Sequence, residues 1–189
     1  KATSPKYITE ISPMKLPEID PIKEPYRASK LDQEKLLIKS NINYIIARPT
    51  QFTGPGKIPG VIEFYIAKEI LGILAGKQKI ISVRNKFGEV DMLDVRDIAK
   101  AYLTLIKKGD VGKIYHISSG HPVTVERLAK TFLEVVGLNS NKFLINSTDN
   151  EQTSYFRFSP ARLESLGWNP RYNLKDALTS YWEYFKNQK

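Results

Sequence analysis

The sequence contains no cysteine, and this absence removes several classes of chemistry. Disulfides, thiolate metal sites and cysteine nucleophiles are all excluded. No apolar run approaches the roughly 18 residues that a membrane-spanning helix needs, and residues 1–15 do not resemble a signal peptide. We therefore expect a soluble, cytoplasmic protein that has no membrane partner.

Acidic residues are outnumbered, 20 against 29 basic ones, which gives a net charge of +9 that suits anionic partners. The basic residues are scattered, with no arginine-rich run and no nucleic-acid-binding motif, so nucleic acid is not expected as a partner. A phosphorylated small molecule explains the charge equally well, as does ordinary solubility from exposed lysines. Lys107-Lys108 is interpreted as a solvated helix end. No spacing of histidines and carboxylates indicates a metal site.

Helical and strand-like segments alternate along the chain, which indicates the α/β class. Residues 1–25 contain five prolines and have the composition of a loop. Hydrophobic patterns after this loop predict strands at 42–48, 79–83, 113–117 and 142–146, and helices at 26–39, 61–74, 94–108, 124–137, 160–166 and 173–185. Asp94 and Asp97 are expected to cap a helix, and His116 to be structural. Two or three strong strands are too few for a complete doubly wound sheet.

Tyr26 and Lys30 stand four residues apart in a segment without glycine, where Pro25 suits the first helical turn. At this spacing two side chains lie on one face of a helix. An ammonium group beside a phenol stabilises the phenolate and brings acid–base catalysis by a phenol closer to neutral pH. The same spacing also occurs on solvated helix surfaces. The pair is thus a candidate for proton transfer.

Four motifs follow one another in the order of a known family. They are Tyr26-Arg-Ala-Ser-Lys30, Arg48-Pro-Thr-Gln-Phe-Thr-Gly-Pro-Gly56, Asp91-Met-Leu-Asp-Val-Arg-Asp97 and Leu166-Gly-Trp-Asn-Pro170. With them, the chain resembles the C-terminal portion of an extended short-chain dehydrogenase/reductase, a family of NAD(P)-dependent nucleotide-sugar epimerases, dehydratases and reductases. The resemblance is greatest to GDP-mannose dehydratases and GDP-4-keto-6-deoxymannose reductases.

The resemblance implies a fold and a division into domains. The fold would be the C-terminal part of a Rossmann-type doubly wound parallel sheet, with a smaller mixed α/β substrate-binding domain. Residues 1–50 would complete the dinucleotide-binding domain, and 51–189 would mainly form the substrate-binding domain. Residues 79–108 would return to the Rossmann sheet.

The resemblance also assigns roles to residues. Tyr26 would exchange the proton, while Lys30 would hold the nicotinamide ribose of NAD or NADP. Thr3, four residues before a tyrosine, would donate a hydrogen bond to the sugar, with Ser4 as the alternative if the register slips. Arg48 would contact the cofactor, or would cap a strand end through a buried ion pair.

Departures from the family pattern concern the substrate. Dehydratases of the family place acidic residues directly after the catalytic threonine, where this chain has Ser4 and Pro5, so dehydration is disfavoured. Gln51 stands where an asparagine usually meets the sugar diphosphate. Val90 replaces a common arginine, and Arg157 is the nearest candidate for the later substrate arginine. Reduction, epimerisation or dehydrogenation of a nucleotide sugar, with GDP as the preferred nucleotide, remains.

The glycine-rich turn that cradles a dinucleotide pyrophosphate is missing from residues 1–189, since the Gly54-Pro-Gly56 segment stands in the wrong context. We therefore expect a part of a longer protein that binds dinucleotide poorly on its own. The resemblance implies a homodimer that packs the Tyr26 helix and the next long helix. The alternative to an enzyme is a truncated or non-catalytic relative that acts in binding or assembly.

Overall fold

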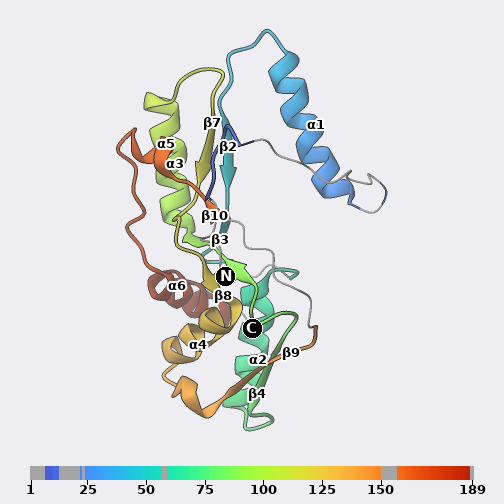
Figure 1. Cartoon of the computed structure of the whole chain (residues 1–189). Helices are drawn as coiled ribbons and strands as arrows, with labels where there is room; N and C mark the ends of the chain where they lie inside the picture. Colours follow the sequence, from blue (N-terminus) through green and yellow to red (C-terminus); the bar gives the residue numbers. More distant parts are fainter. Residues whose placement is uncertain (1–6, 13–21, 23, 57–58, 150–156, 188–189) are drawn as a thin grey trace, which may run out of the picture.

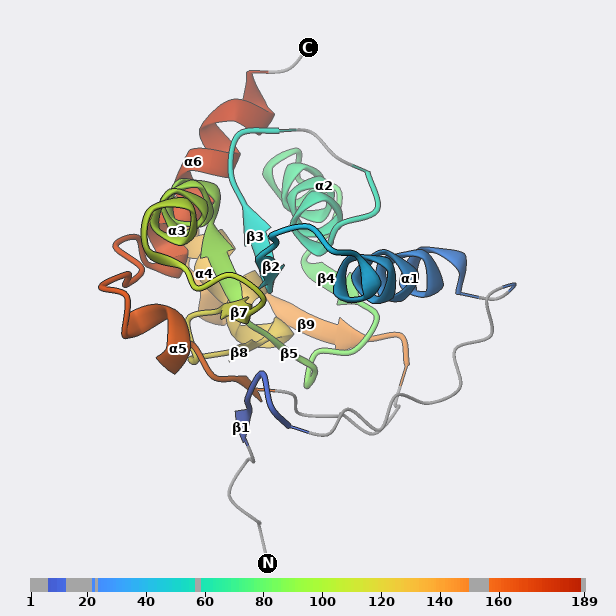
Figure 2. The same ribbon diagram turned by 90° about the horizontal axis from the view of Figure 1, so that it is seen from above.

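The computed structural model describes residues 7–12, 22, 24–56, 59–149 and 157–187. In Figure 1 the upper half holds α1 (Pro25–Lys39), α3 (Val95–Lys108) and α5 (Ala161–Glu164) around β2 (Ile46–Pro49) and β7 (Ile114–Ile117). The lower half holds α2 (Ile62–Leu74), α4 (Val125–Val135) and α6 (Leu174–Lys186) beside β4 (Ile80–Val83) and β9 (Leu144–Ser147). Figure 2 shows α1 set off to one side of the other elements.

Parallel pairing dominates the described strands, as the predicted α/β class requires. β2 pairs with β7, and β4 with β9, both in parallel. Parallel pairs also join β3 (Gln51–Thr53) to β6 (Met92–Asp94) and β1 (Tyr7–Ile8) to β10 (Arg157–Phe158). β5 (Glu89–Val90) and β8 (Val123–Thr124) pair antiparallel. The four longest strands were predicted, whereas strands of two or three residues are too short to give a periodic signal.

Element boundaries differ most at the first predicted strand. It begins at Ile46 rather than at Ile42, because Ile42 lies exposed in the connection from α1. The other predicted helices and long strands occur within a few residues of their expected bounds. A short 3-10 helix, η1 (Ser140–Lys142), precedes β9.

Two hydrophobic cores meet at β6. The lower core joins α2, α4 and α6 to β4 and β9, and the upper core joins α3 and β7 to Leu163 and Trp168. Met92 belongs to the lower core and Leu93 to the upper one. Consecutive side chains of a strand point to opposite faces, so one strand serves both cores.

Helix α1 packs only lightly against the described part of the chain. None of its side chains is buried; the half-buried positions Ala28, Leu31, Glu34 and Leu37 recur every three residues. Neighbours at this spacing contact each other, but the row winds around the helix; Leu36 and Ile38 are 70% and 54% exposed. Helix α1 therefore leaves two large apolar side chains exposed among the described residues.

Buried aspartates connect the motif at 91–97 to distant loops. Asp91 accepts hydrogen bonds from the backbone N–H of Ser119 and Gly120, and the Asp94 carboxylate caps α3 by accepting from the Arg96 N–H. The expectation that Asp97 also caps the helix was wrong. Its side chain is fully buried, and one oxygen accepts from the backbone N–H of Arg171 and Tyr172, each at 3.0 Å.

Two further features concern single elements. Asn173 caps α6 and forms a reciprocal capping box with Asp176, as the predicted cap at that position implied. Among the described residues, no helix combines the length and the apolar character needed to cross a lipid bilayer.

Replacing Asp97 by alanine tests the tether between α3 and the loop before α6. The buried carboxylate and its two partly buried N–H partners would lose their hydrogen bonds, so Asp97→Ala should lower the free energy of unfolding in urea by about 2–4 kcal/mol. Asp32→Ala, which removes an exposed aspartate paired with Lys35, is the matched control and should cost less than about 1 kcal/mol. Equal losses in the two variants would contradict the assigned tether.

Candidate functional site

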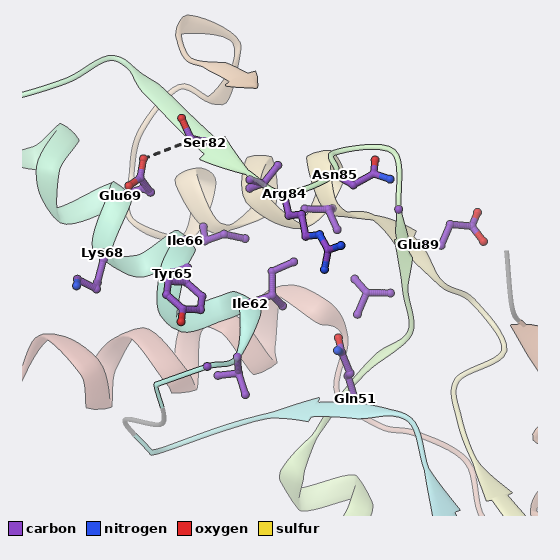
Figure 3. Close-up of a pocket in the computed structure, with 16 residues that line it drawn as sticks. Gln51, Ile62, Tyr65, Ile66, Lys68, Glu69, Ser82, Arg84, Asn85 and Glu89 are labelled. Carbon is purple, nitrogen blue, oxygen red and sulfur yellow. Dashed lines mark hydrogen bonds between the residues drawn. The ribbon is translucent and has the colours of Figure 1, made fainter. Parts of the chain in front are cut away.

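An open cleft of about 930 Å³ lies between α2 and the strands that face it. Figure 3 shows its walls: Tyr65 and Lys68 on α2, Arg84 and Asn85 directly after β4, and Gln51 at the start of β3. Glu69 fixes the wall between α2 and β4, because its carboxylate accepts from the Ser82 N–H at 3.3 Å. The cleft thus lies at the carboxyl end of β4, where ligands bind in open α/β sheets.

A second hollow, of about 400 Å³, adjoins this cleft and shares Gln51, Glu89 and Val90 with it. It also takes in Pro49, the last residue of β2, and Phe158 on β10. The Arg157 guanidinium donates to the Glu89 carboxylate at 3.1 Å, and this contact raises the pKa of Arg157. Gln51 therefore lines both hollows, whereas Arg157 lines neither and reaches them only through Glu89.

The Tyr26 and Lys30 side chains lie next to each other on α1. The Lys30 Nζ atom is 5.7 Å from the centre of the Tyr26 ring, and Lys30 also donates to Gln33 at 3.4 Å. Tyr26 is 73% exposed, so its hydroxyl is open to a ligand. Among the described residues, no hydrogen bond or ion pair joins either side chain to the cleft.

Arg48, predicted to contact the cofactor or to form a buried pair, lies on β2 beside α1. Its Nε donates to Glu34 Oε1 at 2.9 Å and its Nη2 to Glu34 Oε2 at 2.5 Å. This two-pronged pair is about four-fifths buried and connects α1 to β2. A role of Arg48 at the cofactor stays a prediction.

Thr3 and Ser4 lie outside the described residues. The strand that follows them, β1, pairs with β10, and the Tyr7 hydroxyl donates to the Gly120 carbonyl at 3.3 Å. His116 is buried in β7, and its ring packs edge-on against Phe158 at 5.1 Å between centres. Burial lowers the pKa of His116, which is consistent with the structural role expected for it.

A buried carboxyl group lies under the Thr53–Gly56 loop, at a small cavity of about 80 Å³. Glu63 and Tyr181 both line this cavity, and Thr53 and Glu63 are nearly inaccessible to solvent. Burial raises the pKa of Glu63 and raises that of Tyr181 as well. The Tyr181 hydroxyl has no hydrogen-bond partner in the described part of the chain.

Apart from Gln51, the residues that line the main cleft were not predicted from the sequence. Arg84 and Asn85 carried a usable signal, because they directly follow a predicted strand and so were bound to lie at a carboxyl end. Tyr65 and Lys68 carried none, since they look like any polar positions on an amphipathic helix. No group of three or more potential metal ligands occurs within the described ranges.

The raised pKa of Glu63 predicts how stability depends on pH. A carboxyl group whose pKa is higher in the folded than in the unfolded protein destabilises the fold once pH rises above its ordinary value of 4.5. Glu63→Gln should therefore be more stable than the parent chain at pH 8, by thermal melting, and the difference should vanish near pH 4. The exposed Glu183→Gln is the control and should show no such trend; a parent chain that is more stable than Glu63→Gln at pH 8 would contradict the assignment.

Comparisons with known proteins show where the chain belongs. The model of the NAD dependent epimerase/dehydratase family matches residues 6–118. GDP-6-deoxy-D-mannose reductase of Pseudomonas aeruginosa is 31% identical over 175 residues, which are 85% of this chain and 56% of the reductase. Human dTDP-D-glucose 4,6-dehydratase is 26% identical over 172 residues, 86% of this chain and 48% of that enzyme. The chain thus spans about half the length of these relatives.

Solved structures show the same fold. RMD from Pseudomonas aeruginosa complexed with NADPH superposes with a TM-score of 0.76 at 26% identity, covering 87% of this chain and 57% of that one. dTDP-glucose 4,6-dehydratase from Bacillus anthracis in complex with NAD gives a TM-score of 0.77 at 17% identity, covering 98% and 58%. The predicted Rossmann-type α/β fold is confirmed, and the chain belongs to the NAD-dependent epimerase/dehydratase family.

Proposed function

We propose that this chain is the substrate-binding and proton-transferring part of an NAD(P)-dependent enzyme that modifies a nucleotide sugar. The observation that carries the proposal is the Tyr26–Lys30 pair, one helical turn apart on α1 with the ammonium 5.7 Å from the ring. Among the reactions of the family, reduction, epimerisation or dehydrogenation of a GDP-sugar is preferred. The 31% identity to a GDP-6-deoxy-D-mannose reductase supports this choice.

The exposed Tyr26 and Lys30 side chains fit a dinucleotide, because both present polar groups that no other described element covers. The nicotinamide ring, when bound, supplies or accepts the hydride at one sugar carbon. Lys30 would donate hydrogen bonds to the nicotinamide ribose and stabilise the phenolate of Tyr26. During reduction, the Tyr26 hydroxyl would give its proton to the sugar oxygen; in the oxidative direction it would take that proton back. Thr3, or Ser4, would orient the same oxygen.

The main cleft is the proposed seat of the nucleotide and its diphosphate. The first turn of α2 borders the cleft at Val61 and Ile62, and no side chain caps it. Unpaired N–H groups at a helix start favour an anion, and Lys68 and Arg84 add positive charge. Gln51 would donate a hydrogen bond from its side-chain amide to the substrate where the cleft approaches β2. Arg157 would bind the substrate beside Glu89.

Several expectations belong to this proposal. The chain would use NAD or NADP, with residues 1–50 completing the dinucleotide-binding domain and 51–189 mainly holding substrate. Residues 79–108 would return to the Rossmann sheet. A homodimer would cover the exposed apolar positions Leu36 and Ile38 of α1. Dehydration is disfavoured by Ser4 and Pro5.

A non-catalytic relative that acts in binding or assembly is the second candidate. The light packing of α1 favours it, because an exposed helix with apolar positions can serve as a docking element. Such a relative has no chemical need for Tyr26 and Lys30. Substitution of the phenol therefore separates the two functions.

Tyr26→Phe, made in the protein that carries the complete dinucleotide-binding half, removes the proposed proton donor and little else. We expect nucleotide-sugar turnover to fall by about 100-fold or more, measured by absorbance of the reduced cofactor, while cofactor binding stays close to that of the parent. Tyr102→Phe, which removes the same hydroxyl from an exposed position on α3 outside the cleft, is the matched control and should keep substantial turnover. Undiminished turnover in Tyr26→Phe would overturn the assigned site.

A further inference from the structure

A second cleft, of about 470 Å³, lies on α3 far along the chain from the proposed catalytic pair. Its two walls are the C-terminal half of α3 and the segment between α5 and α6, which run alongside each other in Figure 1. Its volume falls within the range of small-molecule sites. No residue of this cleft lines either hollow of the proposed substrate site.

Positive charge converges on this cleft from both walls. Lys100, Lys107 and Lys108 lie on one face of α3, since positions i, i+7 and i+8 of a helix share a face, and Arg171 stands opposite. None of the described lining residues is acidic, and within the described ranges no carboxylate forms an ion pair with any of the four. Elsewhere on α3 the acids are occupied: Asp94 pairs with Arg96, and Asp97 holds the loop.

Hydrogen bonds hold the two walls in place, and only one of them, from Lys108, uses a cationic side chain of the cleft. Trp168 Nε1 donates to the Asp97 carbonyl at 3.1 Å, and the Asp97 carboxylate accepts from the Arg171 N–H at 3.0 Å. Lys108 Nζ donates to the Leu166 carbonyl at 2.9 Å, which leaves further N–H groups on the same ammonium. The Lys100 ammonium lies 5.4 Å from the Tyr172 ring centre. A cleft whose walls are already ordered loses little entropy when it binds a ligand.

From these observations we infer that the α3 cleft, formed by Lys100, Lys107, Lys108 and Arg171, binds a small molecule that carries two or more linked phosphate groups. A single phosphate has a charge of about −1.5 to −2 at pH 7, which four cations exceed, whereas a diphosphate matches them. Arginine grips phosphate oxygens with two parallel N–H groups, and lysines supply point charges beside it. Thr104 and Asn169 also line the cleft and add polar groups. The solvated helix end predicted at Lys107-Lys108 is therefore one wall of an anion site.

Titration of the full chain with inorganic pyrophosphate, followed by nitrogen-15 NMR, tests the site. Saturable shifts are expected at the backbone amides of Gly167, Asn169 and Arg171. The double variant Lys107→Gln/Arg171→Gln should weaken this binding by about tenfold or more, because it removes a charge from each wall. Both side chains are exposed, so the fold should persist.

The control is Lys77→Gln/Lys79→Gln, which removes the same charge from exposed positions between α2 and β4 and should leave affinity within about twofold. Inorganic phosphate should bind more weakly than pyrophosphate. GDP tighter than pyrophosphate at these amides would identify a nucleotide as the source of the phosphates; equal affinities would identify the diphosphate alone.

Three results would overturn the inference: no saturable shift at residues 167–171, an equal loss in both double variants, or tighter binding of a single-stranded oligonucleotide there, which would indicate a nucleic-acid surface. Since the two clefts share no residue, none of these results bears on the proposed enzymatic function.

Discussion

The fold depends on the need of buried carboxylates for hydrogen-bond donors. Within residues 91–97, Asp91 takes N–H groups from the loop after β7, Asp94 takes one from the first turn of α3, and Asp97 takes two from the segment before α6. A buried charge without partners costs several kcal/mol, so each loop is held where its N–H groups meet an aspartate. One short motif thereby fixes elements separated by more than seventy residues.

This arrangement explains how far the sequence alone could lead. Periodicity identified the long helices and strands, and ordered motifs identified the family, because both signals lie within short stretches of chain. Asp97 was misjudged since its partners, Arg171 and Tyr172, are distant in sequence and carry no mark of their own. The short strands were not predicted for a different reason: two or three residues, as in β5, are too few to show an alternation of apolar and polar side chains.

The same distinction between local patterns and distant partners applies to the residues of the candidate site. Tyr26 and Lys30 could be found from their spacing, because a helix places them together by geometry alone. The cleft between α2 and β4 could not be found from the sequence, because Tyr65 and Lys68 line a cleft only once the fold places the facing strand beside them. The same holds for the α3 cleft, where two lysines that look merely solvated face an arginine over sixty residues away.

The position of β6 between two cores has a consequence for how this protein can vary. Met92 and Leu93 are covalent neighbours that fill different interiors. The strand cannot rotate or slide to relieve crowding around one of them without displacing the other, because interiors are packed close to crystalline density. A change of side-chain volume at Met92 therefore affects the packing around Leu93, and the reverse also holds, although the two side chains belong to different cores. The two cores can diversify at their peripheries, but along β6 they must change in concert.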